Sequence, residues 1–284
     1  MLRSRLEKKT GTVIANRKNS IGAPAFAEQG RQITGFTRYK PGKNPLLSAI
    51  QVQLPTDFSE LIYHFRIQEI IRILRKAGAK SDATRGCGVH IHIGANGHTP
   101  KTLRNLANIM ASHESLLSDA LALDRNRVAR YCRTVDPDFL RELNLKKPTT
   151  MARFADIWYT SQNADFGRTQ HYNGSRYHML NYHATFTKGT VEFRLFQFDA
   201  PADGKQNGLH AGQLRSYIQL CLALSEMAKE VSGASAKPQQ NENPKYAMRT
   251  WLLRLGFIGD EFKTARDILT KRLPGDAAFR TARV

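Results

Sequence analysis

Apolar residues recur at helical spacing in several stretches of the chain. One stretch covers about residues 57–77, follows Thr56 and ends at Gly78. A hydroxyl residue before the first turn and a glycine after the last turn are typical helix ends, so this stretch predicts a helix. The other predicted helices begin at Thr99-Pro100 or cover about 150–160, 208–231, 245–255 and 259–272.

Two segments alternate between apolar and polar residues, as strands with one buried face do. In GVHIHIG (88–94) every second residue is apolar, which leaves His90 and His92 together on the opposite face. In TVEFRLF (190–196) the same alternation runs through Leu195 and leaves Glu192 and Arg194 on one face. Strand-like segments on both sides of Lys188-Gly189 predict a hairpin over about 176–199.

The chain has 284 residues, of which 41% are hydrophobic, which is enough for one large α+β domain or two small ones. Lys and Arg number 43 against 24 Asp and Glu, so the formal net charge of +19 favours anionic partners. Three scattered cysteines indicate a reduced protein without a disulfide framework. No apolar run approaches membrane-spanning length and no secretory signal is evident, so we expect a cytoplasmic protein.

Three parts of the chain differ in character. Residues 1–50 are basic and lack periodicity, which predicts an irregular N-terminal arm. Residues 51–231 hold the predicted strands and main helices and form the expected catalytic domain. Residues 232–284 are expected to form a polar linker followed by the C-terminal helices.

The polar faces of the two predicted strands carry the candidate chemistry. Two imidazoles after a glycine-rich segment suit a metal or a phosphate, and surface histidines are an equally weighted alternative. Glu192 and Arg194 suit a cation beside an anionic oxygen, although a surface ion pair gives the same pattern.

A third candidate segment is SRYHMLNYH (175–183). Arg176 and Asn181 are placed to reach a ligand, and Tyr177 offers a ring for stacking on a base. His178 and His183 fit structural roles better than ligand contacts.

The ordered set of motifs resembles the amidoligase family of glutamine synthetase-like and glutamate–cysteine ligase-like carboxylate–amine ligases. GCGVHIHIG (86–94) is similar to the glycine-rich His-x-His strand of glutamine synthetases. TVEFR (190–194) is similar to their later R-x-E-x-R strand, with Thr190 at the first arginine. The helix ending in LRKAGA, the run RYHMLNYHATFTKGTVEFRLF and the run LHAGQLRSYIQLCLALS extend the similarity over about 57–230.

The resemblance implies a curved antiparallel sheet with helices packed on one face, in a glutamine synthetase-like catalytic domain that is incomplete at its N-terminus. It implies an ATP-dependent ligase that joins a small-molecule or peptide carboxylate to an amine through an acyl phosphate, with Mg²⁺ or Mn²⁺. His90 and Glu192 match metal ligands, and His92 matches a residue near the nucleotide phosphates. Arg194 and Arg176 match arginines that act on the carboxylate or the phosphoryl groups, and Asn181 is a further candidate for nucleotide contact.

The chain departs from the family pattern near its N-terminus. The resemblance leads us to expect an early Glu-x-Glu pair and a Glu-hydrophobic-Val-(Ser/Thr)-Pro segment. The second aligns with AIQVQLP (49–55), where Gln51 and Gln53 replace acids. Because neutral amides are weaker cation ligands than carboxylates, the activity is expected to be impaired. A truncated or shifted front, a non-catalytic relative, and carboxylates supplied by another chain are three alternative explanations of this departure.

Two other functions fit parts of the sequence. The high positive charge allows a nucleic-acid-binding protein without catalysis, although no known nucleic-acid-binding motif is present. A zinc-dependent hydrolase would use Cys87, His90 and His92, with His98 as a fourth ligand.

Overall fold

The computed structural model describes residues 49–50, 60–200, 208–238 and 242–280. The N-terminal arm, the cap at Thr56 and the two glutamines at 51 and 53 lie outside these residues. The helices are α2 (Glu60–Lys76), α3 (Pro100–Leu121), α4 (Arg125–Tyr131), α5 (Pro137–Lys146), α6 (Met151–Thr160), α7 (His183–Lys188), α8 (Ala211–Glu230), α9 (Pro244–Arg254) and α10 (Lys263–Thr270). Short 3-10 turns cover Ala83–Arg85, Gly174–Arg176 and Asp260–Phe262.

Four described strands form one mixed sheet in the order β1-β2-β4-β3. They are β1 (Ala49–Ile50), β2 (Gly88–Gly94), β3 (Leu180–Asn181) and β4 (Thr190–Phe196). β2, β4 and β3 pair antiparallel, whereas β1 runs parallel to β2. The expected α+β fold with an antiparallel sheet is therefore confirmed, with a parallel edge strand added.

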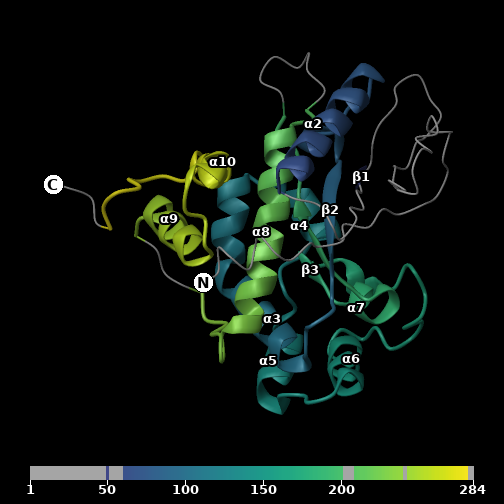
Figure 1. Cartoon of the computed structure of the whole chain (residues 1–284). Helices are drawn as coiled ribbons and strands as arrows, with labels where there is room; N and C mark the ends of the chain where they lie inside the picture. Colours follow the sequence, from purple (N-terminus) through teal and green to yellow (C-terminus); the bar gives the residue numbers. More distant parts are fainter. Residues whose placement is uncertain (1–48, 51–59, 201–207, 239–241, 281–284) are drawn as a thin grey trace.

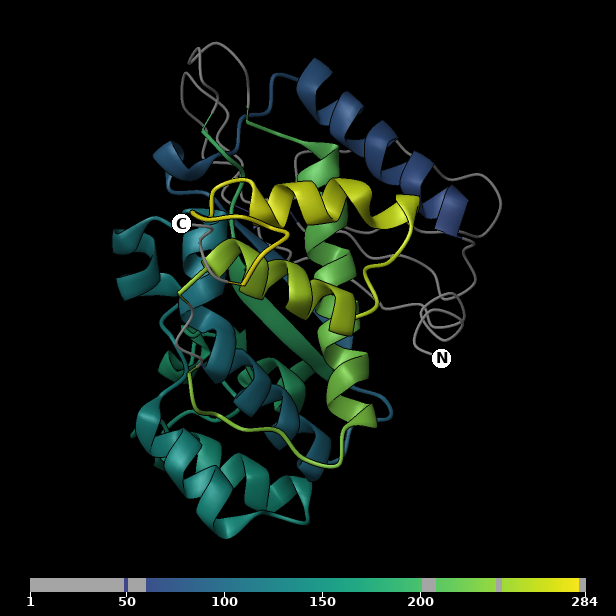
Figure 2. The same ribbon diagram turned by 90° about the vertical axis from the view of Figure 1, so that its left-hand side faces the viewer.

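Helices cover one side of the sheet in two layers. α3 and α8 lie against the strands (Figure 1), and α9 and α10 lie outside them (Figure 2). Asn105 of α3 donates from Nδ2 to the carbonyl oxygens of Ala228 and Val231, at 3.2 and 2.9 Å, and so joins α3 to the end of α8. The apolar positions of β2 are fully or almost fully buried, as the alternation predicted.

Local sequence signals account for several helix ends. Thr99 caps α3 through a capping box with Thr102, and Pro100 occupies the first turn. Gly78 ends α2 with a φ of 77°, a left-handed conformation that glycine adopts without steric cost. The predicted helix near 150–160 and the two C-terminal helices are also present.

The predicted hairpin around Lys188-Gly189 is wrong in its details. β3 and β4 do pair antiparallel, with Asn181 opposite Glu192, but β3 is only two residues long. The short helix α7 joins the two strands in place of a tight turn, and Gly189 ends that helix with a φ of 66°. The strand-like residues between 182 and 188 are therefore drawn into a helical turn.

A β-bulge interrupts the alternation of β4. Ile91 pairs with Phe193, but Val89 pairs with Phe196, so β4 has one more residue than β2 in this interval. The strict alternation that was expected to continue through Leu195 is therefore wrong beyond Phe193. As a result, two residues of β4, Arg194 and Leu195, lie opposite the single residue His90 of β2.

The guanidinium of Arg127, from α4, donates hydrogen bonds to the backbone of this bulge. Its NH1 donates to the carbonyl oxygen of Leu195 at 2.7 Å, and its NH2 donates to that of Arg194. A Cβ atom at Gly88 would lie 2.6 Å from NH2, so the absence of a side chain there admits the guanidinium. We expected this glycine to let a metal or phosphate approach the backbone, whereas its close neighbour is Arg127.

Candidate functional site

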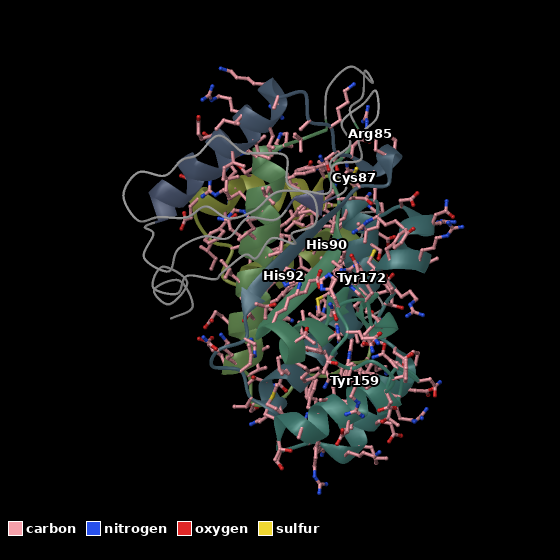
Figure 3. All side chains as sticks on the ribbon, turned by 90° about the vertical axis from the view of Figure 1, so that its right-hand side faces the viewer. Arg85, Cys87, His90, His92, Tyr159 and Tyr172 are labelled. Atoms are coloured by element: carbon pink, nitrogen blue, oxygen red, sulfur yellow. The ribbon has the colours of Figure 1, made fainter. Side chains whose placement is uncertain are left out.

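Glu192 lies at the centre of a buried polar cluster on β2 and β4. Its Oε1 atom is 2.8 Å from Arg194 NH1, 3.2 Å from His90 Nδ1 and 3.4 Å from His92 Nε2. Figure 3 shows the two histidines along β2, after Arg85 and Cys87 on the preceding segment. The pairing of His92 with Glu192 confirms our expectation that the two strands are neighbours, whereas the expectation that their polar faces turn to one cavity stays a prediction.

Two further side chains hold this cluster in place. Asn181 of β3 donates from Nδ2 to Glu192 Oε2 at 2.6 Å, and its Oδ1 accepts from the backbone N–H of His183 at 2.8 Å. His92 Nδ1 lies 2.9 Å from the hydroxyl of Thr190. Both Asn181 and Thr190 therefore orient other site residues, and a direct contact of Asn181 with nucleotide stays a prediction.

The environment determines the charges in the cluster. Burial by itself would raise the pKa of Glu192, but Arg194 and the two histidines hold that pKa well below its usual value. Burial, followed by the charge of Arg194, lowers the pKa of His90 to about 3. At neutral pH the cluster therefore contains an ionised carboxylate beside an uncharged His90, which is the state that binds metal ions.

Arg194 is itself buried, with an exposed fraction of 4%. Its Nε donates to the carbonyl oxygen of Tyr131 at 3.4 Å, and its guanidinium carbon lies 5.5 Å from the centre of the Tyr177 ring. The Glu192–Arg194 pair is therefore an interior ion pair, and the surface-pair alternative is wrong.

Arg176 also lies against the ring of Tyr177. Its guanidinium carbon is 5.9 Å from the Tyr177 ring and 5.3 Å from the Tyr172 ring. NH1 donates to the carbonyl oxygen of His171 at 2.7 Å. Tyr177, considered in the sequence for stacking on a base, thus stacks against two arginines.

Other histidines serve structural contacts. His178 Nδ1 is 2.6 Å from the carbonyl oxygen of Thr134. His183 contacts the hydroxyl of Tyr159 at 2.7 Å and the carbonyl oxygen of Gln170 at 2.9 Å. The structural interpretation of both histidines fits these contacts.

The zinc alternative gains no support from the geometry. His98 contacts Thr102 through Nδ1 and Ser225 through Nε2, at 3.0 and 2.9 Å. Cys87 is buried and its thiol donates to the carbonyl oxygen of Arg85 at 3.7 Å. Within the described ranges, no group of three or more His, Cys, Asp or Glu side chains is arranged to hold a metal ion.

Two cavities formed by described residues lie away from this cluster. One, of about 260 Å³, is bordered by Arg133, Phe166 and Ser175. The other, of about 1100 Å³, lies between α3, α8 and α9 beside the stacked rings of His113 and Trp251. Neither is lined by His90 or Glu192.

Sequence reasoning missed two cations near the cluster, Arg127 and Lys188. The half-buried Lys188 ends α7, and the charges of Glu192, Arg176 and Arg194 all act on it. No local motif marks either residue, because the first reaches the strands from a separate helix and the second was assigned to a turn.

Comparison with family models identifies the family of the chain. A family model described as "putative amidoligase enzyme" matches residues 54–225, which is more than half of the chain and includes both site strands. The chain belongs to this amidoligase family, a family of ligase-type enzymes.

No curated protein and no solved structure matches the chain. Among the described helices, none has the length and apolar character needed to cross a membrane.

Proposed function

We propose that the chain is an ATP-dependent carboxylate–amine ligase with a glutamine synthetase-like catalytic sheet formed by β2, β4 and β3. A carboxylate oxygen of the acid substrate attacks the terminal phosphorus of ATP and releases ADP. The amine then displaces phosphate from the acyl phosphate and leaves an amide or isopeptide bond. Such a reaction needs groups that bind anionic oxygens beside a cation.

One observation supports this proposal above the others. His90 Nδ1 and Glu192 Oε1 both approach the NH1 atom of Arg194, at 3.3 and 2.8 Å. With His90 uncharged and its proton on Nε2, both atoms are acceptors directed at one cationic group. These two acceptors are 3.2 Å apart and converge on positive charge, so they supply two of the ligands that a cation site needs.

The donor set fits one divalent cation of the Mg²⁺ or Mn²⁺ type. Magnesium in nucleotide sites takes one or two carboxylates and completes its shell with phosphate oxygens and water. A site built on this pattern does not require three protein ligands. Glu192 and His90 would hold the ion, which would neutralise phosphate charge when bound, and the imidazole ligand favours manganese as a substitute.

The remaining residues act on the substrate groups. Arg194 would hold the carboxylate or the transferred phosphoryl group, as the family resemblance implies, and its planar guanidinium suits two oxygens at once. His92 and Arg176 would face the nucleotide phosphates, and Asn181 would keep Glu192 oriented for the cation. Gln51 and Gln53 make a second cation weakly bound and turnover slow.

Calorimetric titration with ATP in the presence and absence of Mg²⁺ tests the proposal. We expect magnesium-dependent binding that His90→Ala weakens at least about ten-fold, and that Arg194→Lys also weakens because lysine cannot make a bidentate contact. Lys263→Gln on α10, far from the site strands in sequence, is the control. Unchanged ATP binding in both site variants would show that the site is wrongly assigned.

An ADP-release assay across a panel of acids and amines then identifies the substrates. The Gln51→Glu/Gln53→Glu variant is expected to release ADP faster than the parent, because added carboxylates strengthen a second cation site. Nucleic-acid binding at physiological salt without any ATP affinity would favour the non-catalytic alternative. Stoichiometric zinc in the purified protein would favour the hydrolase.

A further inference from the structure

The large cavity beside α9 lies where the family domain meets the C-terminal part of the chain. Its volume of about 1100 Å³ is comparable with the upper end of pockets that hold small organic ligands, which is about 1,000 Å³. α3 and most of α8 fall within residues 54–225, which match the family model, whereas α9 lies outside that match. The cavity is therefore formed in part by sequence that the family model does not describe.

One wall of the cavity is a pair of stacked rings. The ring centres of His113 on α3 and Trp251 on α9 lie 3.9 Å apart, and their planes differ by 13°. Met227 of α8 also lines the cavity, and α9 lies on the outer side of α8 (Figure 2). Flat rings and a thioether offer an apolar surface against which another planar ring packs well.

This ring wall carries no charge at neutral pH. His113 Nδ1 lies 2.8 Å from the carbonyl oxygen of Ile109, which can only accept, so Nδ1 carries the proton. Burial lowers the pKa of His113, the bond to Ile109 opposes that change, and the charge of Arg254 lowers the pKa further. The charges at this cavity therefore come from its other lining residues.

Those charged residues are mostly positive. Three are cations and one is a carboxylate, namely Lys237, Arg254, Arg280 and Glu242. All four are exposed, and none of them forms an ion pair with another residue in the described part of the chain. The lining therefore has a surplus of two positive charges, which favours a ligand that carries negative charge.

We propose that this cavity is a second ligand site, separate from the cluster around Glu192, and that it binds an aromatic carboxylate. The aromatic body lies against the wall of His113 and Trp251. The carboxylate faces the cations, among which the guanidinium of Arg254 suits two oxygens at once. The inference goes beyond the proposed ligase function and does not depend on it.

Calorimetric titration of the full chain with naphthoate tests the site, and naphthamide, which has the same rings and no charge, is the matched ligand. We expect naphthoate to bind at least about five-fold more tightly than naphthamide at low salt. Because the cations are exposed, added salt should reduce this difference. A change in tryptophan fluorescence on binding is expected too, since Trp251 lines the cavity.

Three variants locate the bound ligand. Arg254→Gln is expected to weaken naphthoate binding by about three-fold and to leave naphthamide binding unchanged, because an exposed charge contributes little. Arg249→Gln, which removes the same charge from an exposed position of α9 outside the cavity lining, is the control and should have no measurable effect. Ala247→Phe fills part of the cavity and should weaken both ligands by about ten-fold or more. Circular dichroism checks folding, and Arg254→Gln decides the outcome if Ala247→Phe does not fold.

Four results would overturn the proposal. They are a parent that binds neither ligand, naphthamide that binds as tightly as naphthoate, an equal loss in Arg249→Gln and Arg254→Gln, and naphthoate binding that His90→Ala abolishes. The last would place naphthoate in the cluster around Glu192. If the parent binds neither ligand and gel filtration shows a dimer that Ala247→Phe dissociates, a second copy of the chain covers this face instead.

The same data distinguish this site from the proposed function. Naphthoate binding that depends on Arg254, without magnesium-dependent ATP binding, leaves the second site and removes the ligase. Magnesium-dependent ATP binding that His90→Ala weakens, in a chain that does not bind naphthoate, leaves the ligase and removes the second site.

Discussion

Glu192 on β4 and Glu114 on α3 are both buried, with exposed fractions of 2% and 4%, yet their surroundings drive their charges in opposite directions. Glu192 is surrounded by Arg194 and two histidines, and its pKa lies well below the usual value. Both oxygens of Glu114 accept from the backbone N–H of Val135, at 2.9 and 3.0 Å, and burial raises its pKa to about 7. Burial therefore does not decide the charge of a carboxyl group, and the partners do.

The comparison separates a chemical site from a structural contact. A carboxylate held ionised among cationic and imidazole groups is suited to binding a metal and phosphates. A carboxyl group bonded to one backbone amide joins α3 to the loop before α5. Four predictions test this distinction, from the largest expected effect to the smallest.

Glu192→Gln is expected to have the largest effect. The change leaves Arg194 buried without its counter-charge, so we expect a loss of about 3–5 kcal/mol in the free energy of unfolding. Glu114→Gln keeps an oxygen for the Val135 amide and should cost much less. Urea denaturation of both variants measures the difference, and equal losses would refute the contrast between the two sites.

Stability should depend on pH through Glu114. The folded-state pKa of about 7 lies above the ordinary value of 4.5, so the folded protein binds the proton more tightly than the unfolded chain does. This contribution is complete below pH 4.5 and is lost as pH rises to about 7, by at most about 3 kcal/mol. The stability difference between the parent and Glu114→Gln, measured by denaturation from pH 4 to 8, isolates it from the histidines. A flat difference would contradict the raised pKa.

Gly88→Ala tests the role of Arg127 in supporting the site. The added methyl group meets the guanidinium that bonds to the β4 bulge, and we expect a loss of about 1–3 kcal/mol. Gly94→Ala, at the other end of β2, is the control, because a Cβ atom there has no described neighbour within 4 Å. In an Arg127→Ala background the Gly88→Ala loss should become smaller, and an unchanged loss would place its cause elsewhere.

The smallest expected effect is the pH dependence of Mn²⁺ binding in the absence of nucleotide. His90 has a pKa of about 3 and therefore stays uncharged down to pH 5. We expect the affinity of the protein for Mn²⁺ to vary less than about three-fold between pH 5 and 8. A histidine ligand with the ordinary pKa would lose about thirty-fold over that range. Calorimetry at four pH values measures the trend, and a thirty-fold loss would show that His90 titrates normally or that another residue binds the ion.

Most of the helices and the two site strands could be predicted from the sequence. The spacing of apolar residues in α3, the cap at Thr99 and the alternation of β2 are local properties that each segment carries by itself. The alternation of β2 also predicted that His90 and His92 share one face, and the family resemblance predicted that Glu192 belongs to the same site.

The errors occurred where distant residues compete with local preference. The residues before Gly189 have strand-like composition, but α7 forms there and positions Lys188 near the site. At the bulge opposite His90, the backbone of β4 accepts hydrogen bonds from Arg127, which comes from a separate helix and has no signal near β4.

The amino-acid sequence by itself determined the ligase-family motifs, the amphipathic helices and the alternation that places two histidines on one face of β2. Only the tertiary structure decided that Glu192 is ionised and that Glu114 keeps its proton up to about pH 7. The physical reason is that periodicity depends on neighbours along the chain. Charge and pKa depend on groups that approach through space after the chain has folded.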